Sequence, residues 1–231
     1  MKNLLTALLL IFISVSAWSK PFIIGKDQAP INAHDYAILK KVAKNAGIPV
    51  EKFKHYNNKR YDHFLVGSEG MLYSDKKKNG VIDGNDVPAT GIISRYGNSY
   101  ITDKNGFVIA IEISKTQFNN TNILNGFKKI IAINVSKCKV RDVNFSGLPA
   151  LRHMVIFGGG EKRVTLKNLK NLNKLAYLKV WNLDAGNFKK MTGLKSLHKA
   201  EFESIALSSF AGLNNMPNLK ELEISLSGGF N

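Results

Sequence analysis

Residues 172–183 read LNKLAYLKVWNL, residues 194–205 read LKSLHKAEFESI, and residues 216–224 read MPNLKELEI. Each stretch places large apolar residues three positions apart at first and then at alternate positions. The copies begin 22 residues apart, at Leu172, Leu194 and Met216. A fixed period of this length is typical of solenoids, in which each repeat forms one turn that stacks on the next. These stretches therefore predict a solenoid.

The same pattern extends toward the N-terminus in three further copies, so that it runs from residue 108 to residue 224. Their strand centres are Ile111, Ile133 and Met154, and the next centre is Leu178. The steps between these centres are 22, 21 and 24 residues. Alternation along each strand sends every second side chain into the core between the layers. We therefore expect six strands that pair in parallel, with about 4.8 Å between neighbours.

The repeated phrases resemble the leucine-rich-repeat family, whose pattern is L-x-x-L-x-x-L-x-L-x-x-N/C-x-L. The resemblance is carried by KLAYLKVWNL (174–183), GLKSLHKAEF (193–202) and NLKELEIS (218–225), and DKNGFVIAIEIS (103–114) resembles a first repeat. The length is closest to the internalin-like class. This implies an α/β leucine-rich-repeat solenoid over residues 105–231, with about six parallel strands on its concave face.

One position departs from the family, because it lacks the asparagine that forms a ladder of side-chain hydrogen bonds. It holds Thr116, Cys138, Gly159, Leu183, Ile205 and Ser227. The sequence therefore predicts the stack of repeats without the usual asparagine ladder at this position.

Residues 20–104 are expected to form a small α+β domain that caps the first repeat, whose apolar face must be covered. Asn32 followed by Asp35 is close to a capping box and predicts a helix start. Apolar residues on one helical face continue to Ala46, and Gly47 is a suitable C-cap. Further short elements are expected as a helix at 50–56 and strands at 92–94, 99–102 and 108–113.

Residues 1–19 have the features of a secretory signal peptide: Lys2, an apolar run at 4–13, and small residues ending at Ser19. The alternative is an uncleaved membrane anchor, for which the apolar run is short. We expect a protein that is secreted, periplasmic or on the cell surface. With one cysteine, Cys138, the chain forms no internal disulfide.

The net charge of +16 favours acidic partners such as anionic lipid or glycan, although it would also serve solubility alone. The lysines are scattered along the chain without interleaved aromatic residues, so we do not predict nucleic-acid binding.

Residues 75–86 resemble an EF-hand calcium loop, and this is the one place where the sequence suggests a cofactor. The candidate ligands are Asp75, Asn79, Asp83 and Asp86. Oxygen ligands at alternate positions let a tight loop surround a hard cation. Lys77 breaks the pattern, and three adjacent lysines repel the ion. The alternative is a polar turn rich in Asn, Asp and Gly, which we prefer.

The outward side chains of the strands form the candidate partner-binding surface. Its residues are His153, Phe157, Tyr177, Lys179, Trp181, Glu201, Glu203 and Glu223. Aromatic residues carry much of the binding energy at protein interfaces, and an acidic patch lies beside them. The alternative is that the rings pack on one another and the glutamates form a solvated face.

No catalytic motif or metal-ligand spacing is found, so we do not expect an enzyme. The glutamate pairs 201/203 and 221/223 could serve a glycosidase only in an enclosed pocket, which an open sheet face lacks. We expect an exported module that binds a protein or peptide through its concave face. The alternative is a cell-envelope protein that adheres to anionic lipid or glycan. Self-association through an uncovered C-terminal edge is a further expectation.

Overall fold

The computed structural model describes residues 22–23, 30–55, 64–66, 72–74, 87–88, 97–103, 105–158 and 162–226. The expected signal peptide, the calcium-like loop at 75–86 and the strand at 92–94 lie outside these residues. No helix in the described part of the chain combines the length and the apolar character that a membrane crossing requires.

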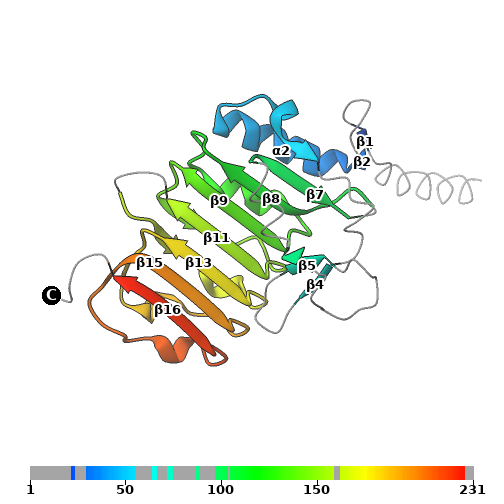
Figure 1. Ribbon diagram of the computed structural model, residues 1–231. Helices are drawn as coiled ribbons and strands as arrows, with labels where there is room; N and C mark the ends of the chain where they lie inside the picture. Colours follow the sequence, from blue (N-terminus) through cyan, green and yellow to red (C-terminus); the bar gives the residue numbers. More distant parts are fainter. Residues whose placement is uncertain are drawn as a thin grey trace, which may run out of the picture.

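A largely parallel sheet of short strands forms the centre of the molecule (Figure 1). Its members are β3 (Lys54–His55), β7 (Ser99–Thr102), β8 (Val108–Ser114), β9 (Ala132–Cys138), β11 (His153–Gly158), β13 (Tyr177–Trp181), β15 (Lys199–Leu207) and β16 (Glu221–Leu226). The spatial order is β16-β15-β13-β11-β9-β8-β7-β3, and β14 (Asp184–Gly186) also pairs with β15. Neighbours from β8 to β16 are parallel, whereas β7 is antiparallel to β8. With its sparse helices, this architecture is compatible with a solenoid-like α/β fold.

The strand register predicted from the spacing is confirmed. Ile111 pairs with Ile133, and Ile133 pairs with Met154. Leu178 pairs with Met154 on one side and with Ala200 on the other. Ala200 then pairs with Leu222 on β16. The uneven steps of 21 and 24 residues therefore leave the strand centres in line, and the extra or missing residues are taken up outside the strands.

One face of the sheet packs against the segments that return from each strand to the next. The returns contain η3 (Thr121–Gly126), β10 (Asp142–Asn144), β12 (Thr165–Lys167), η4 (Leu169–Asn171), η5 (Phe188–Lys190) and η6 (Leu213–Asn215). A single cluster of buried residues runs from Ile31 to Met216. Its inward residues on β13, Leu178 and Val180, are fully buried. Burial of each such side chain contributes about 1.5–3 kcal/mol, which is how stacking stabilises repeats that cannot fold singly.

Asparagine side chains connect successive repeats on the return side, and not at the strand-end position where the family has its ladder. The Nδ2 groups of Asn125 and Asn171 donate to the carbonyls of Asn144 and Ser146 at 3.1 and 3.0 Å. Asn218 donates in the same way to the Lys195 carbonyl at 2.6 Å. At the strand ends, the Thr116 hydroxyl lies 3.4 Å from the Cys138 sulfur. Side-chain hydrogen bonds between repeats are thus found on the return side, in addition to the contact between Thr116 and Cys138 at the strand ends.

Helix α2 (Ala33–Ala46) covers the first repeat and has the predicted ends: Asn32 accepts from the His34 N–H, and Gly47 ends the helix at φ 71°. The expected capping box is wrong. Asp35 is fully buried and accepts a 2.7 Å hydrogen bond from the Val108 N–H, at the start of β8. The expected second helix is only a 3-10 turn, η2 (Val50–Lys52).

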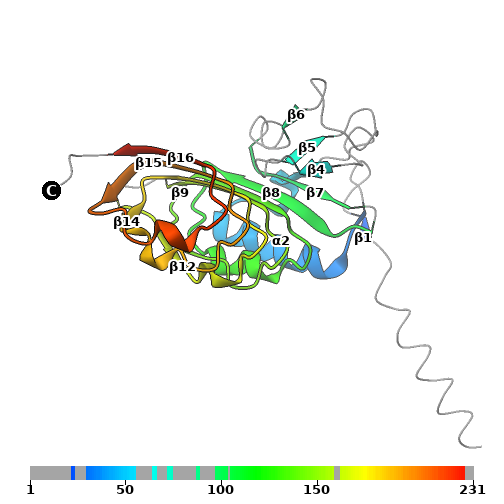
Figure 2. The same cartoon turned by 90° about the horizontal axis from the view of Figure 1, so that it is seen from below.

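The described strands also form two smaller antiparallel sheets, β1 (Phe22–Ile23) with β2 (Pro30–Ile31), and β4 (Phe64–Val66), β5 (Leu72–Ser74) and β6 (Val87–Pro88). Figure 2 shows α2 and the return segments on one side of the large sheet and the β4–β5–β6 sheet on the other. The core is continuous from α2 into the repeats, so β7 and α2 cover the N-terminal end of the stack.

Candidate functional site

The outer face of the sheet, which is turned away from the core, divides into two halves. Over β7, β8, β9 and β11 most outward side chains are buried, and we call this half the covered face. Its residues are Ser99, Ile101, Ala110, Glu112, Ala132, Asn134, His153 and Val155. Over β13, β15 and β16 most outward side chains reach solvent, and we call this half the open face. Its residues are Lys179, Trp181, Lys199, Glu201, Glu203, Glu221, Glu223 and Ser225.

Two of the predicted partner-binding residues are internal. His153 is 1% exposed and Tyr177 is 6% exposed. Their rings stack with centroids 4.5 Å apart and planes 14° from parallel. The β4–β5–β6 sheet lies on this side of the large sheet (Figure 2). The predicted aromatic patch is therefore reduced to Trp181 and the partly buried Phe157, which pair in register on β13 and β11.

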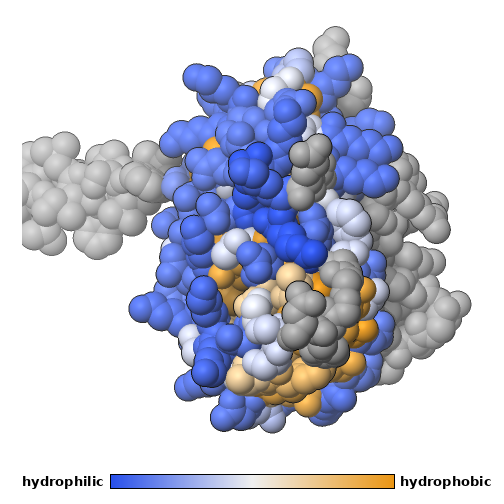
Figure 3. Space-filling model, turned by 90° about the vertical axis from the view of Figure 1, so that its left-hand side faces the viewer, coloured by the Kyte–Doolittle hydropathy of each residue, from blue (hydrophilic) through white to orange (hydrophobic). Residues whose placement is uncertain are grey.

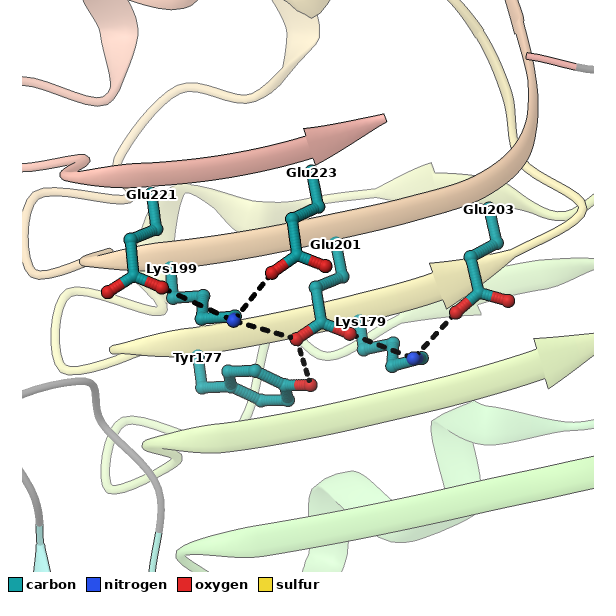
Figure 4. A network of polar contacts seen from close by, with 7 residues as sticks. All are labelled: Tyr177, Lys179, Lys199, Glu201, Glu203, Glu221 and Glu223. Atoms are coloured by element: carbon teal, nitrogen blue, oxygen red, sulfur yellow. Dashed lines mark hydrogen bonds and ion pairs between the residues drawn. The ribbon is translucent and has the colours of Figure 1, made fainter. Parts of the chain in front are cut away.

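The predicted acidic patch is a network of ion pairs that spans three strands (Figure 4). Lys179 lies 2.8 Å from Glu201 and 2.6 Å from Glu203. Lys199 lies 3.3 Å from Glu201, 3.2 Å from Glu221 and 2.7 Å from Glu223. Lysine and glutamate face each other directly in the strand register, at Lys179–Glu201 and Lys199–Glu221. We call this set the Lys–Glu lattice.

The contacts within the lattice shift the pKa of Lys199 and of Glu201 in opposite directions. The pKa of Lys199 is raised above its ordinary value, and the largest cause is the hydrogen bond from its ammonium group to Glu223. Burial opposes ionisation of Glu201, but hydrogen bonds from Lys179 and the Tyr177 hydroxyl lower its pKa below the ordinary value. Two lysines and four glutamates leave two negative charges on this face of a chain whose net charge is +16. The open face is thus an acidic surface on a basic protein.

Trp181 stands at the edge of this lattice and is 37% exposed. Its strand neighbour Glu203 belongs to the lattice, and its other neighbour is Phe157. The Lys179 ammonium lies 5.7 Å from the centroid of the Phe157 ring, within the range of a cation–π contact. The structure therefore brings together Phe157, Lys179, Trp181, Glu201, Glu203 and Glu223 from the predicted set.

The covered face contains a row of buried polar side chains that the repeat pattern did not reveal. Ser99, Glu112 and Asn134 face one another across β7, β8 and β9. Each has an oxygen without a hydrogen-bond partner among the described residues, and both ring nitrogens of nearby His153 are also unpaired there. Burial raises the pKa of Glu112 to about 8 and lowers the pKa of His153 to about 3. Both side chains are therefore neutral near pH 7.

A signal for the covered face was available in the sequence. The outward positions Ala110 and Ala132 of the first two repeats, which pair in register, are small and apolar, whereas the equivalent positions of the last two repeats hold Lys199 and Glu221. An apolar outward column is expected where a sheet face is covered, because exposed strand positions are usually polar.

Among the described residues, no group of three or more His, Cys, Asp or Glu side chains is placed to hold a metal ion. The four predicted calcium ligands lie outside those residues. Cys138 is buried, and burial raises the pKa of its thiol, which favours a structural role over a reactive one. A cavity of about 20 Å³ between β12 and β14, lined by Leu166 and Leu183 among others, has room for one water molecule.

A scan against protein-family models and a search of curated proteins found no match to this chain.

Proposed function

We propose that this chain is an exported leucine-rich-repeat module that binds a protein partner through the open face. The repeat assignment is supported by the parallel register at steps of 22 residues and by short 3-10 returns in place of long helices. Export rests on the signal-like residues 1–19.

The observation that carries this proposal is the contrast between the two halves of the outer face. One half is mostly buried, while the other presents an accessible tryptophan beside an array of paired charges. Tryptophan supplies a large contact area with little loss of side-chain entropy, and fixed charges give orientation and specificity. The partner is expected to be a protein because the described residues of the open face form a broad surface, whereas a small molecule requires an enclosed pocket.

Site-specific photo-crosslinking tests the proposal. A crosslinking amino acid is placed at Ser225, which is exposed on the open face, and in a second sample at Lys174, which is exposed outside it. Both proteins are incubated with envelope and surface proteins of the producing cells, and the products are identified by mass spectrometry. We expect one protein to be captured reproducibly from position 225 and not from position 174. Equal capture from both positions, or none from position 225, would contradict the proposal.

The second candidate function is adhesion to an anionic lipid or glycan, and the exposed lysines outside the open face favour it. They are Lys128, Lys129, Lys137, Lys139, Lys167, Lys170, Lys174, Lys189 and Lys190. Salt distinguishes the candidates, because the screening length falls from about 10 Å at 0.1 M to about 3 Å at 1 M. Adhesion to phosphatidylglycerol vesicles through these lysines would be lost at high salt. An interface centred on Trp181 would persist.

A further inference from the structure

Among the described strands, β16 lies at the end of the large sheet and has one unpaired edge. Within the described residues it pairs with β15 alone, whereas β7, β8, β9, β11, β13 and β15 each have a neighbour on both sides (Figure 1). The N–H and C=O groups along such an edge are a template for another strand.

The core is also incompletely covered at this end. Leu178 and Ala200 are fully buried, but Leu222, which continues their row, is partly exposed. Other partly buried residues pack here against the last layer of the core: Leu213, Leu219 and Ile224. Figure 3 views the molecule from this end and shows hydrophobic residues gathered in one area with hydrophilic residues around it. A segment placed beside β16 would bury this apolar area.

The Lys–Glu lattice determines which charges such a segment should carry. Across the open face, lysine on β13 meets glutamate on β15, and Lys199 on β15 meets Glu221 and Glu223 on β16. The side chains of these two glutamates are 58% and 64% exposed. Figure 4 shows that each binds Lys199 with one carboxylate oxygen, while the second oxygen contacts none of the residues drawn. The next strand would therefore continue the lattice if it presented lysine or arginine.

We propose that the β16 edge binds an extended polypeptide segment in which basic and apolar residues alternate. Its main chain pairs with β16, its basic side chains face Glu221 and Glu223, and its apolar side chains pack beside Leu222 and Ile224. Main-chain hydrogen bonds supply affinity in this mode of recognition, and alternate side chains supply specificity. This site is separate from Trp181 and does not depend on the function proposed for the rest of the open face.

A second copy of the chain is a poorer occupant. Two β16 strands that pair antiparallel around a two-fold axis place residues of the same face opposite each other. With glutamate at both 221 and 223, each such register that pairs most of the strand brings glutamates of the two copies into opposite or diagonal positions. Like charges placed in this way are destabilising. The partner is therefore expected to be a different, basic segment.

Binding of short fluorescent peptides, measured by anisotropy at physiological salt, tests this proposal. One probe alternates lysine and valine, a second alternates glutamate and valine, and a third has the composition of the first in two blocks. We expect the alternating basic probe to bind, although the chain as a whole is basic and would repel it. We expect the acidic and block probes to bind at least about tenfold more weakly. Trp181→Ala should leave this binding unchanged, which separates the site from the proposed partner surface.

Charge reversal provides the matched control. Glu221→Lys/Glu223→Lys should weaken the basic probe about tenfold and strengthen the acidic one. Asp142→Lys/Asp184→Lys changes the net charge by the same amount at exposed positions away from β16. This control should change the binding of neither the basic probe nor the acidic probe. Glu221→Gln/Glu223→Gln removes the two negative charges without placing new positive charges beside Lys199. This variant replaces the charge-reversed one in the binding measurement if the charge-reversed protein does not fold.

Hydrogen exchange identifies the strand that is bound, because bound peptide should slow exchange of the β16 amides. Equal binding of the block probe, equal losses in both charge-reversed variants, or protection at elements other than β16 would overturn the proposal. A dimer of the protein alone that involves β16, detected by sedimentation, would also overturn it in favour of a second copy.

Discussion

Trp181 is the residue whose surroundings most clearly suggest binding. It is an exposed aromatic side chain on the open face, next to charges that already have partners. Truncation of an exposed ring removes contact area without creating a cavity in the core. Its effect should therefore be seen in binding and not in folding.

Trp181→Ala is expected to weaken binding of the partner captured at position 225 by about tenfold or more. Titration calorimetry measures the affinity, and thermal unfolding checks that the fold is retained. Phe210→Ala is the control, because this change also truncates an exposed aromatic ring. Phe210 is about half exposed and lies on a return segment outside the open face. Equal affinity of wild type and Trp181→Ala would remove this residue from the binding surface.

Glu112 is buried on the covered face, and its titration affects stability. The unfolded chain releases this proton near the ordinary pKa of 4.5, whereas burial raises the pKa in the folded protein to about 8. Between these values the folded state holds the extra proton, so the free energy of unfolding falls as the pH rises, by up to about 1.4 kcal/mol per pH unit.

His153 acts in the opposite direction. Its ordinary pKa is 6.5, and burial lowers it to about 3, so the unfolded state binds the extra proton between these values. This contribution to stability is lost as the pH falls below 6.5. The effects of Glu112 and His153 cancel between pH 4.5 and 6.5. These two residues therefore favour a stability maximum in that range and a decline toward pH 8.

Glu112→Gln tests the decline in stability expected above pH 6.5. The variant keeps the shape of the side chain without its ionisation, so the free energy of unfolding should decline less between pH 6.5 and 8 than in wild type. Urea unfolding at several pH values measures the decline. Exposed Glu51→Gln is the matched control and should follow the wild type. If Glu112→Gln declines as steeply as wild type, Glu112 is not the group responsible.

At the scale of elements, the return segments approach each other closely where glycine allows it. Gly193 has φ 85°, and a Cβ at this position would lie 2.4 Å from the Cα of Lys170 in the preceding turn. Gly212 allows the same close approach one repeat later, because a Cβ at this position would lie 2.3 Å from the backbone nitrogen of Lys189. The backbones of successive turns can therefore pack together only if these positions have no side chain.

Gly193→Ala is expected to lower the free energy of unfolding by on the order of 3 kcal/mol, because it combines a strained φ with a steric conflict against backbone. Gly186→Ala separates the two causes. Gly186 has φ 60°, but a Cβ there meets nothing within 4 Å, so its cost should be only about 1–2 kcal/mol. Urea denaturation compares them, and equal losses would show that the close approach does not contribute.

The strands and their register were predictable because local periodicity determines them. Leu178, Val180 and their equivalents recur at nearly constant spacing, and alternation then assigns each remaining residue to the outer face. The role of Asp35 was not predictable, because its partner Val108 is 73 residues away. Burial of His153 was missed for a similar reason: the repeat pattern assigns this residue to a face but does not show what covers that face.

At the scale of the whole molecule, the two ends of the stack differ. At the N-terminal end, α2 and β7 cover the first repeat, and at the other end β16 has, among the strands that the structure describes, a neighbour on one side only. The stability of stacked repeats depends mainly on contacts between neighbours, so an end strand with one neighbour opens more readily.

Native-state hydrogen exchange should therefore show a gradient. We expect amides of β16 to exchange through openings of lower free energy than those of β9 and β11, whose inward and outward side chains are mostly buried. Exchange followed by mass spectrometry of peptide fragments resolves these strands. Uniform protection from β9 to β16 would contradict the expected gradient and indicate that the stack opens as a single unit.

The constant offset between β13, β15 and β16 has a consequence for how this protein could change in length. Leu178 faces Ala200 and Ala200 faces Leu222, so each unit meets the next through equivalent positions. A tandem duplication of residues 177–198 would bring the copied strand into the same alignment with both neighbours. Evolution or protein engineering could in this way widen the sheet by one strand while β8 and β16 keep their present neighbours.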